Sequence, residues 1–424
     1  MQHSARTDGV SAYIAVTAAY WAFMLTDGAL RMLVLLHFHA LGFSPIQLAY
    51  LFLLYEFMGM VTNLSAGWIA KRFGLTTTLY AGLGLQIVAL YMLTKLDPAW
   101  SVAVSVGFVM AVQGLSGVAK DLAKMSSKSA VKLLAPSGDG ALFRWVALLT
   151  GSKNAVKGLG FLLGAALLAT LGFNAAIWAM GLVLTAILVA VAVLMPPGLP
   201  RGKKGTRFSE VFSKDRRVNL LSLARVFLFA ARDVWFVVGI PIYFYSVLSD
   251  GTVEGNRIAF FQIGTFMALW IIAYGAVQSA APQLLRAKGR PVAEIVRLAV
   301  LWVGLLTLIL AVVTAVSWIA GAPSLGLTAF LIGGLLVFGF VFAVNSAAHS
   351  YLILAFSNDD RVTMDVGFYY MSNAAGRLLG TLLSGLSFQL GGLVLCLGTA
   401  AVMAGLSYLV ARRLSDAVDR PVAA

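Results

Sequence analysis

The chain has 424 residues, of which 60% are hydrophobic and only 11% are charged, and its formal net charge is +14. Soluble domains have about 25% charged residues, whereas apolar runs of eighteen or more residues recur here along the whole length, which excludes a soluble globular protein. The basic residues fall in short connections between the apolar runs, so we attribute the charge to membrane topology and predict no nucleic-acid partner.

We predict an all-α integral membrane protein with twelve transmembrane helices. Ser44 and Pro45 are typical of a helix start, and Pro196 with Pro197 ends the sixth helix. The polar N-terminal residues have no features of a removable signal peptide. The first six helices are expected at 11–40, 45–70, 75–95, 100–122, 141–171 and 174–195, and the second six at 218–247, 257–284, 292–319, 325–354, 363–388 and 391–411.

The connections that follow the even-numbered helices carry most of the lysines and arginines, whereas the opposite connections carry only Lys95 and Arg257. This asymmetry predicts that both termini lie in the cytoplasm. The longest polar segment, 197–217, is basic and is expected to be a cytoplasmic linker near anionic lipid. It separates an N-terminal half, 1–196, from a C-terminal half, 218–424.

The two halves show a weak internal repeat. Phe23 and Asp27 of the first helix match Phe229 and Asp233 of the seventh. Lys157 and Gly160 of the fifth helix likewise match Arg377 and Gly380 of the eleventh. Two pseudo-symmetric six-helix halves around a central site are the architecture of the major facilitator superfamily.

The segment GWIAKRFG, after the second helix, resembles the signature of that superfamily, Gly-x-x-x-Asp-Arg-x-Gly. Gly67, Arg72 and Gly74 match it, and Lys71 stands where an acid is usual. The departure affects the charge contact expected at this point and leaves the predicted fold unchanged.

Lys153 and Lys157 lie one turn apart near the middle of the fifth helix, with Asn154 beside them. Each charge at this depth costs roughly 2.5–3.5 kcal/mol, and like charges at this spacing repel. We therefore predict that the three residues bind an anionic substrate. The alternative is that each lysine pairs with a buried carboxylate on a neighbouring helix.

Arg377 follows Tyr369, Tyr370 and Asn373 in the eleventh helix, and we predict that these four residues line the opposite wall of the site. Arginine presents a planar fork that suits phosphate or carboxylate. A structural ion pair is the alternative for Arg377.

The first two helices contribute one cation and two acids. Asp27 and Arg31 are four residues apart, so they either pair within the helix or act separately, Arg31 on the substrate and Asp27 as a protonation site. Glu56 is the only acid in its apolar stretch, and is interpreted either as a proton carrier or as a neutral, hydrogen-bonded group.

The seventh helix supplies Arg232 as a substrate ligand and Asp233 as a further candidate for proton coupling. Arg225 is expected at the membrane interface, and Pro241 is expected to kink the helix.

Lys120, Asp121 and Lys124 lie at the inner end of the fourth helix, where we predict a cytoplasmic mouth that attracts anions. Anchoring of the helix end by basic residues is the alternative.

The sequence gives little support for a metal site or for a disulfide. The single cysteine, Cys396, excludes a disulfide within the chain, and His37 and His39 point in different directions on a helix. We predict no metal, no cofactor and no enzymatic activity.

Four blocks of the sequence together resemble the ArsJ organoarsenical efflux permeases, which are bacterial inner-membrane members of the major facilitator superfamily. The blocks are YWAFMLTDGALRMLVLLHFHALG, GLSGVAKDLAKMSSKSAVKLL, VALLTGSKNAVKGLGFLLG and RVFLFAARDVWFVVGIP. The resemblance implies export of 1-arseno-3-phosphoglycerate, which a glyceraldehyde-3-phosphate dehydrogenase forms when arsenate replaces phosphate, and hence arsenate resistance. It implies no particular binding residues.

Three functions remain in competition at this point. The first is an exporter of this arsenylated anion, driven by proton exchange and acting as a monomer. The second is an antiporter of the same fold that exchanges another organophosphate for phosphate. The third, a membrane-bound enzyme or receptor, does not explain cations at mid-membrane depth in both halves.

Overall fold

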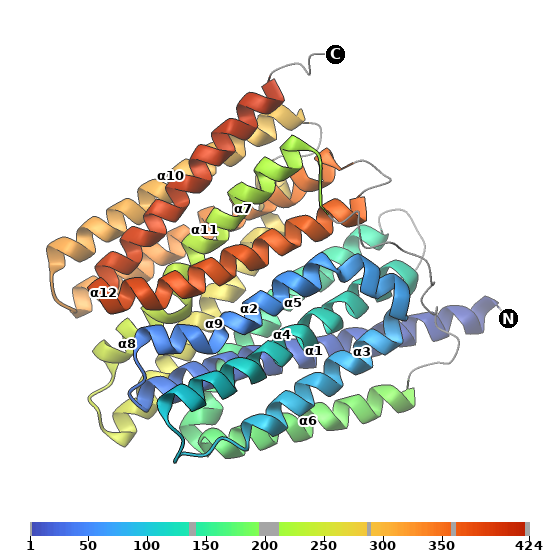
Figure 1. Ribbon diagram of the computed structural model, residues 1–424. Coiled ribbons are helices and arrows are strands. Elements are labelled where there is room, and N and C mark those ends of the chain that lie inside the picture. The colour runs from blue at the N-terminus through green and yellow to red at the C-terminus, as the bar shows by residue number, and fades with distance from the viewer. Residues whose placement is uncertain (1, 135–140, 195–211, 286–289, 358–361, 420–424) are drawn as a thin grey trace.

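The computed structural model describes the backbone of residues 2–134, 141–194, 212–285, 290–357 and 362–419. Within these ranges, side chains are described except at 2–13, 66–67, 70–71, 75, 128–134, 141–151, 194, 282 and 362–364. Most of the predicted linker, 197–211, lies outside the described residues. Every described element is a helix, and most are long and run side by side (Figure 1).

The N-terminal half contains α1 (Gln2–Ala40), α2 (Pro45–Leu64), α3 (Ala66–Leu93), α4 (Val102–Leu134), α5 (Ala141–Leu171) and α6 (Phe173–Leu194). The C-terminal half contains α7 (Arg216–Val234), the π-helix η2 (Trp235–Gly239), α8 (Ile240–Leu248), α9 (Val253–Leu284), α10 (Val292–Ala320), α11 (Leu325–Phe356) and α12 (Val362–Asp419).

The described helices account for the twelve predicted membrane crossings. Eleven stretches are long and apolar enough to cross a membrane, and the last of them, Asp365–Asp419, has 55 residues. A straight helix of that length would extend about 80 Å, against a hydrocarbon core of about 30 Å. The chain bends at Gly391 and Gly392, where Gly392 has φ +60°, so α12 supplies the eleventh and the twelfth crossings.

Several helix boundaries differ from the prediction. The first helix begins at Gln2, nine residues early, and the last ends at Asp419, eight residues late. The second helix ends at Leu64, six residues early. The next helix already begins at Ala66 and bends at Gly74, where φ is +76°. The fourth helix continues to Leu134, about three turns beyond the predicted end, because the chain after residue 122 has the composition of a helix and contains no glycine or proline. The predicted start at Ser44 is confirmed, and its hydroxyl caps the helix.

The seventh crossing is continuous through α7, η2 and α8, with its irregular turn just before Pro241. Proline has no backbone N–H, so the regular hydrogen-bond pattern fails here and the helix widens. The side chain of Ser384 on α12 accepts hydrogen bonds from the amides of Val238 and Gly239, at 3.1 and 3.3 Å. The predicted irregularity is therefore a π-helical turn that α12 supports.

The internal repeat appears as two similar helix crossings. A Cβ atom at Gly160 of α5 would lie 2.5 Å from the carbonyl oxygen of Leu25 in α1, and one at Gly380 of α12 would lie 2.9 Å from that of Ala230 in α7. Both glycines thus permit backbone contact with the first helix of their own half. The alignment of Gly160 with Gly380 has a direct structural counterpart.

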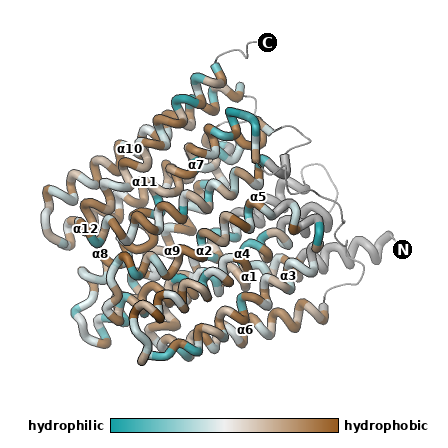
Figure 2. The backbone as a smooth tube through the Cα atoms, in the orientation of Figure 1, coloured by the Kyte–Doolittle hydropathy of each residue, from teal (hydrophilic) through white to brown (hydrophobic). Residues whose placement is uncertain are grey.

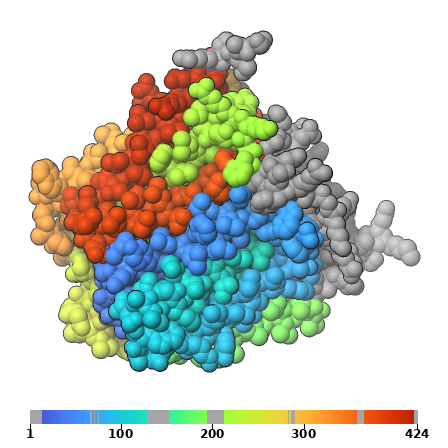
Figure 3. All heavy atoms as spheres, in the orientation of Figure 1, coloured from blue at the N-terminus to red at the C-terminus, as the bar shows by residue number. Residues whose placement is uncertain are grey.

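The two halves meet where α5 packs against α9 and where α2 packs against α12. In Figure 3 the blue and cyan atoms of the N-terminal half meet the orange and red atoms of α12 along such a boundary. Hydrophobic residues cover the flanks of the helices and hydrophilic residues gather towards their ends (Figure 2). The start of α1 and the end of α12 lie at the same end of the bundle (Figure 1), as an even number of crossings requires.

The α1–α5 crossing provides a test of the packing. A Cβ atom at Gly164 would lie 2.1 Å from the carbonyl oxygen of Ala29, whereas one at Gly181 of α6 has no atom within 4 Å. We expect Gly164→Ala to destabilise the protein by about 1–3 kcal/mol because the helices must move apart. Thermal unfolding of detergent-purified protein measures this, with Gly181→Ala as the matched control. Equal melting temperatures for the two variants would contradict this packing.

Candidate functional site

Lys157 on α5 pairs with Asp27 on α1. Its ammonium lies 3.5 Å from Oδ2 of Asp27, and the hydroxyl of Tyr55 on α2 donates to Oδ1 of the same carboxylate at 2.6 Å. Asp27 is buried, while 17% of the Lys157 side chain is exposed. The partner that sequence reasoning offered as the alternative for Lys157 is therefore present, and Lys157 still reaches accessible space.

Glu56 on α2 is shared by two arginines that come from different halves of the protein. Its Oε1 lies 3.0 Å from Nη1 of Arg31 on α1, and its Oε2 lies 3.1 Å from Nη2 of Arg377 on α12. The Glu56 side chain is fully buried, and 15% and 19% of the two arginine side chains are exposed. One carboxylate thus faces two guanidinium groups.

These contacts bear on the alternatives that the sequence left open for the first two helices. Asp27 and Arg31 do not form the pair within α1 that their spacing permits, since each pairs with a residue on another helix. Glu56 is neither isolated nor held by neutral groups, because Arg31 and Arg377 both contact it. The fold brings three helices together around this acid, which spacing along one helix cannot reveal.

Arg232 and Asp233, adjacent on α7, form a pair of their own. An Nη2–Oδ1 distance of 2.5 Å joins them although neighbouring residues project about 100° apart, because the long arginine side chain folds back. The guanidinium also lies 4.9 Å from the ring centroid of Phe229 and 5.5 Å from that of Phe342. Arg232 is 12% exposed, so it too borders accessible space.

Arg225, expected near the cytoplasmic end of its helix, is buried within the C-terminal half, where it is only 3% exposed. Its Nε donates to Oδ1 of Asn373 at 2.6 Å, and its Nη1 donates to the backbone oxygen of Ser346 at 2.9 Å. The ring of Tyr369 lies 4.8 Å from its guanidinium carbon. Two of the predicted wall residues, Asn373 and Tyr369, therefore contact this arginine.

The remaining predicted ligands lie where the halves meet. Tyr370 on α12 contacts the N-terminal half, since the Lys124 ammonium is 4.8 Å from its ring centroid. Nδ2 of Asn154 donates to Oε1 of Gln278 on α9 at 3.2 Å. Lys153, beside Asn154, is partly buried and also has interaction partners.

The predicted cytoplasmic mouth divides into two environments. Asp121 accepts hydrogen bonds from Thr62 at 2.7 Å and Asn63 at 3.1 Å, and Lys124 lies 3.5 Å from its other oxygen. Lys124 also donates to Oδ1 of Asn63 at 2.8 Å, which completes a network between α2 and α4. Lys120 is 6% exposed, and its ammonium lies over the ring of Tyr55 at 4.0 Å. Lys120 is thus next to the central acids and not at the rim.

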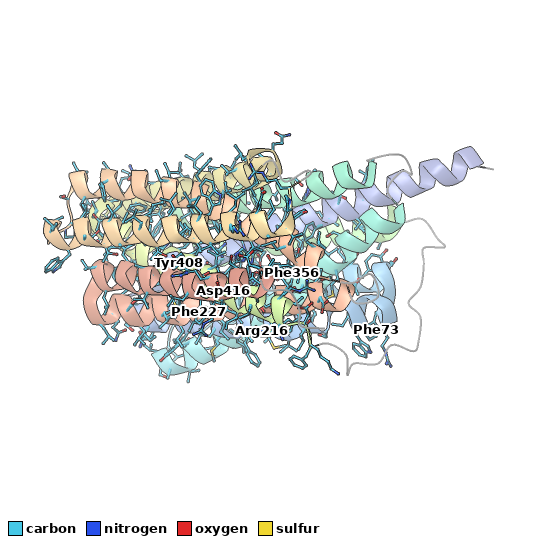
Figure 4. All side chains as sticks on the ribbon, turned by 90° about the horizontal axis from the view of Figure 1, so that it is seen from above. Phe73, Arg216, Phe227, Phe356, Tyr408 and Asp416 are labelled. Atoms are coloured by element: carbon cyan, nitrogen blue, oxygen red, sulfur yellow. The ribbon has the colours of Figure 1, made fainter. Side chains whose placement is uncertain are left out.

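Polar groups outside the predicted set connect these pairs. Tyr55, Thr62, Asn63, Gln278 and Ser346 all sit in otherwise apolar stretches. Their isolation among hydrophobic neighbours was the available signal in the sequence. Side chains fill the spaces between the ribbons (Figure 4). Tyr55, Thr62, Asn63 and Ser346 are buried and Gln278 is partly buried.

Basic groups in this interior outnumber acidic ones. The acids are buried, whereas the cations that they contact are partly exposed. The arrangement can therefore present positive charge to a ligand while the acids hold the cations in place. The basic residues are Arg31, Lys120, Lys124, Lys153, Lys157, Arg225, Arg232 and Arg377, and the acidic residues are Asp27, Glu56, Asp121, Asp233 and Asp365.

Solved structures of transporters share this fold. A mutant of the nucleoside transporter NupG aligns with a TM-score of 0.67 at 14% identity, covering 97% of this chain and 100% of that one. A POT family transporter in complex with 5-aminolevulinic acid aligns at 0.68 and 15% identity, covering 96% of both chains. A POT family transporter in complex with a thioalcohol-conjugated peptide aligns at 0.69 and 15% identity, again covering 96% of both.

Sequence comparison gives the family directly. No curated protein sequence matches the chain significantly. The family model described as Major Facilitator Superfamily matches residues 12–330, which is more than half of the chain. The twelve crossings, the two similar halves and the solved transporters of the same fold agree with this match. The chain therefore belongs to the Major Facilitator Superfamily, and it is a membrane transporter and not an enzyme.

Proposed function

We propose that this transporter carries a small organic molecule with more than one anionic group. The observation that carries the proposal is the pair of arginines on Glu56, Arg31 from one half and Arg377 from the other. A single carboxylate cannot neutralise two guanidinium groups, so a positive charge remains between the halves. Guanidinium groups bind carboxylate and phosphate through two parallel hydrogen bonds. A ligand that brings such groups would complete the site.

The proposed substrate is 1-arseno-3-phosphoglycerate, which the resemblance to the ArsJ permeases implies. It carries a phosphate and an arsenate ester, and Lys157, Arg232 and Arg377 offer partly exposed cations from both halves. Export followed by breakdown of the ester would remove arsenate from the cell. The transporter would then depend on a glyceraldehyde-3-phosphate dehydrogenase that makes its substrate.

Proton exchange is proposed as the energy source, with Asp27 as the leading carrier and Glu56 and Asp233 as the other candidates. Asp27 is buried, and a single ammonium, that of Lys157, neutralises it. When an anion binds Lys157, the Asp27 carboxylate would lose part of this compensation and would take up a proton. Anion binding at Lys157 and proton binding at Asp27 would thus be linked through one ion pair.

We further propose the bacterial inner membrane as the location, with the monomer as the working unit. The end of the bundle that contains the start of α1 and the end of α12 (Figure 1) would face the cytoplasm, because connections after even-numbered crossings share the side of the N-terminus and these connections carry most of the basic residues. Residues 197–217 would link the halves 1–196 and 218–424 on that side and contact anionic lipid.

The central arginine provides a direct test of the site. We expect Arg377→Met to lower substrate uptake into everted vesicles by about 10- to 100-fold, because a charge-assisted hydrogen bond to the anion contributes about 1.5–3 kcal/mol. Arg297→Met is the matched control, since Arg297 is exposed and pairs with Asp419 at the periphery. Unimpaired uptake by Arg377→Met at equal expression would refute the proposed site.

The substrate is tested by arsenate accumulation in cells that contain this protein, with and without the dehydrogenase. We expect accumulation to fall only when both proteins are present, because the exported species is the arsenylated product. A fall without the dehydrogenase would refute the arsenoester as substrate. Phosphate counterflow in proteoliposomes would instead indicate an organophosphate–phosphate antiporter.

Proton coupling is tested by Asp27→Asn, which preserves an acceptor for the Tyr55 hydroxyl but removes the charge. We expect exchange of substrate across proteoliposomes to continue, because the cations remain, while accumulation driven by a pH gradient is lost. Asp121→Asn is the matched control, since Asp121 belongs to the separate network of Thr62 and Asn63. Gradient-driven accumulation by Asp27→Asn would remove Asp27 from the mechanism.

A further inference from the structure

Lys120 differs from the other interior cations in its surroundings. It is 6% exposed, and its Nζ atom makes no hydrogen bond to any residue that the structure describes. The ring of Tyr55, 4.0 Å away, contributes a cation–π contact. An ammonium has three donors, and leaving all of them unbonded in the interior is strongly unfavourable unless an acceptor arrives.

Lys124, one turn further along α4, is a lysine of the same helix whose ammonium has hydrogen-bond and ion-pair partners. Its ammonium donates to Asn63 at 2.8 Å and lies 3.5 Å from Asp121. Lys120 therefore lacks acceptors even though polar groups are available nearby. This environment indicates that the hydrogen-bond donors of Lys120 are available to a ligand.

Tyr55 connects Lys120 to Lys157. The phenol ring contacts the Lys120 ammonium, and its hydroxyl donates to Asp27, which in turn pairs with Lys157. The two ammonium groups are thus arranged around one Tyr–Asp unit. They come from α4 and α5, both in the N-terminal half.

Glu56, the next residue of α2, arranges the guanidinium groups of Arg31 and Arg377. The Arg31 guanidinium carbon lies 5.6 Å from the centroid of the Tyr55 ring that Lys120 also contacts. The ammonium and guanidinium groups therefore adjoin at Tyr55, and each set has its own acid, Asp27 for Lys157 and Glu56 for the two arginines.

We propose that the interior contains two anion subsites, an ammonium subsite formed by Lys120 and Lys157 and a guanidinium subsite formed by Arg31 and Arg377. The ligand class is a short carbon chain with an anionic group at each end. This inference rests on the proposed anion transport and adds Lys120 as the residue that distinguishes two-headed from one-headed anions. When the ligand binds, Lys120 donates to its second anionic group and gains the acceptors that it lacks.

The experiment compares two three-carbon probes, 3-phosphoglycerate, with a phosphate and a carboxylate, and glycerol 3-phosphate, with a phosphate only. Their binding to purified protein in lipid nanodiscs is measured by calorimetry. We expect the wild-type protein to bind 3-phosphoglycerate about tenfold more tightly, because the second group makes a charge-assisted hydrogen bond. We expect Lys120→Met to reduce the ratio to about one without weakening glycerol 3-phosphate. Lys124→Met is the matched control and should keep the ratio.

An unchanged ratio in Lys120→Met, or an equal loss for both probes, would overturn the role of Lys120 while the anion site stands. Binding of neither probe by the wild-type protein would refute the anion site and this subsite together. Lys120→Arg, which keeps the charge, guards against misfolding of the methionine variant. It should retain a preference for 3-phosphoglycerate, and loss of that preference in a folded Lys120→Arg protein would also count against the proposal.

Discussion

The contact between Glu56 and two arginines is the constraint on which the interior depends. Arg31 and Glu56 belong to the N-terminal half and Arg377 to the C-terminal half, so one buried carboxylate links the two halves. Removing one partner of a buried pair is strongly destabilising, by about 3–5 kcal/mol, because a charge is left unpaired. Separation of the halves around this acid therefore requires a replacement for the lost charge contact. An anionic substrate would supply a replacement for the carboxylate on Arg377.

Close helix packing brings the charged groups within reach of one another. At Gly59, one turn after Glu56, a Cβ atom would lie 3.5 Å from Oδ2 of Asp121 and 3.8 Å from Nη2 of Arg377. At Gly28, beside Asp27, a Cβ atom would lie 2.6 Å from the backbone oxygen of Lys157. Small residues permit helix approach that side chains would prevent. Gly28 is thus required for the close approach of α1 and α5, whereas the contacts at Gly59 leave room for a methyl group.

The sequence predicted the individual charged residues of the site better than it predicted their partners. Lys157 and Arg377 were identified because a charge in an apolar stretch is visible in one helix at a time. Their partners were not, since the spacing of Asp27 and Arg31 left open whether they pair along α1, and the structure pairs each across helices. The burial of Arg225 could not be read from its position in one helix. Its burial follows from Asn373 and the Ser346 carbonyl, which lie on α12 and α11.

The sequence by itself determined the helical class, the twelve crossings, the repeat of the two halves and which interior positions carry charge. These features are local, because apolar length and unusual residues can be read along one stretch of chain. Only the tertiary structure decided which charges meet. Glu56 contacts one arginine from each half, and the Lys120 ammonium lies over the ring of Tyr55. The residues of the predicted mouth divide between two environments. Such contacts join residues far apart in the chain, and the rotation and closeness of packed helices, which no spacing records, decide which of them form.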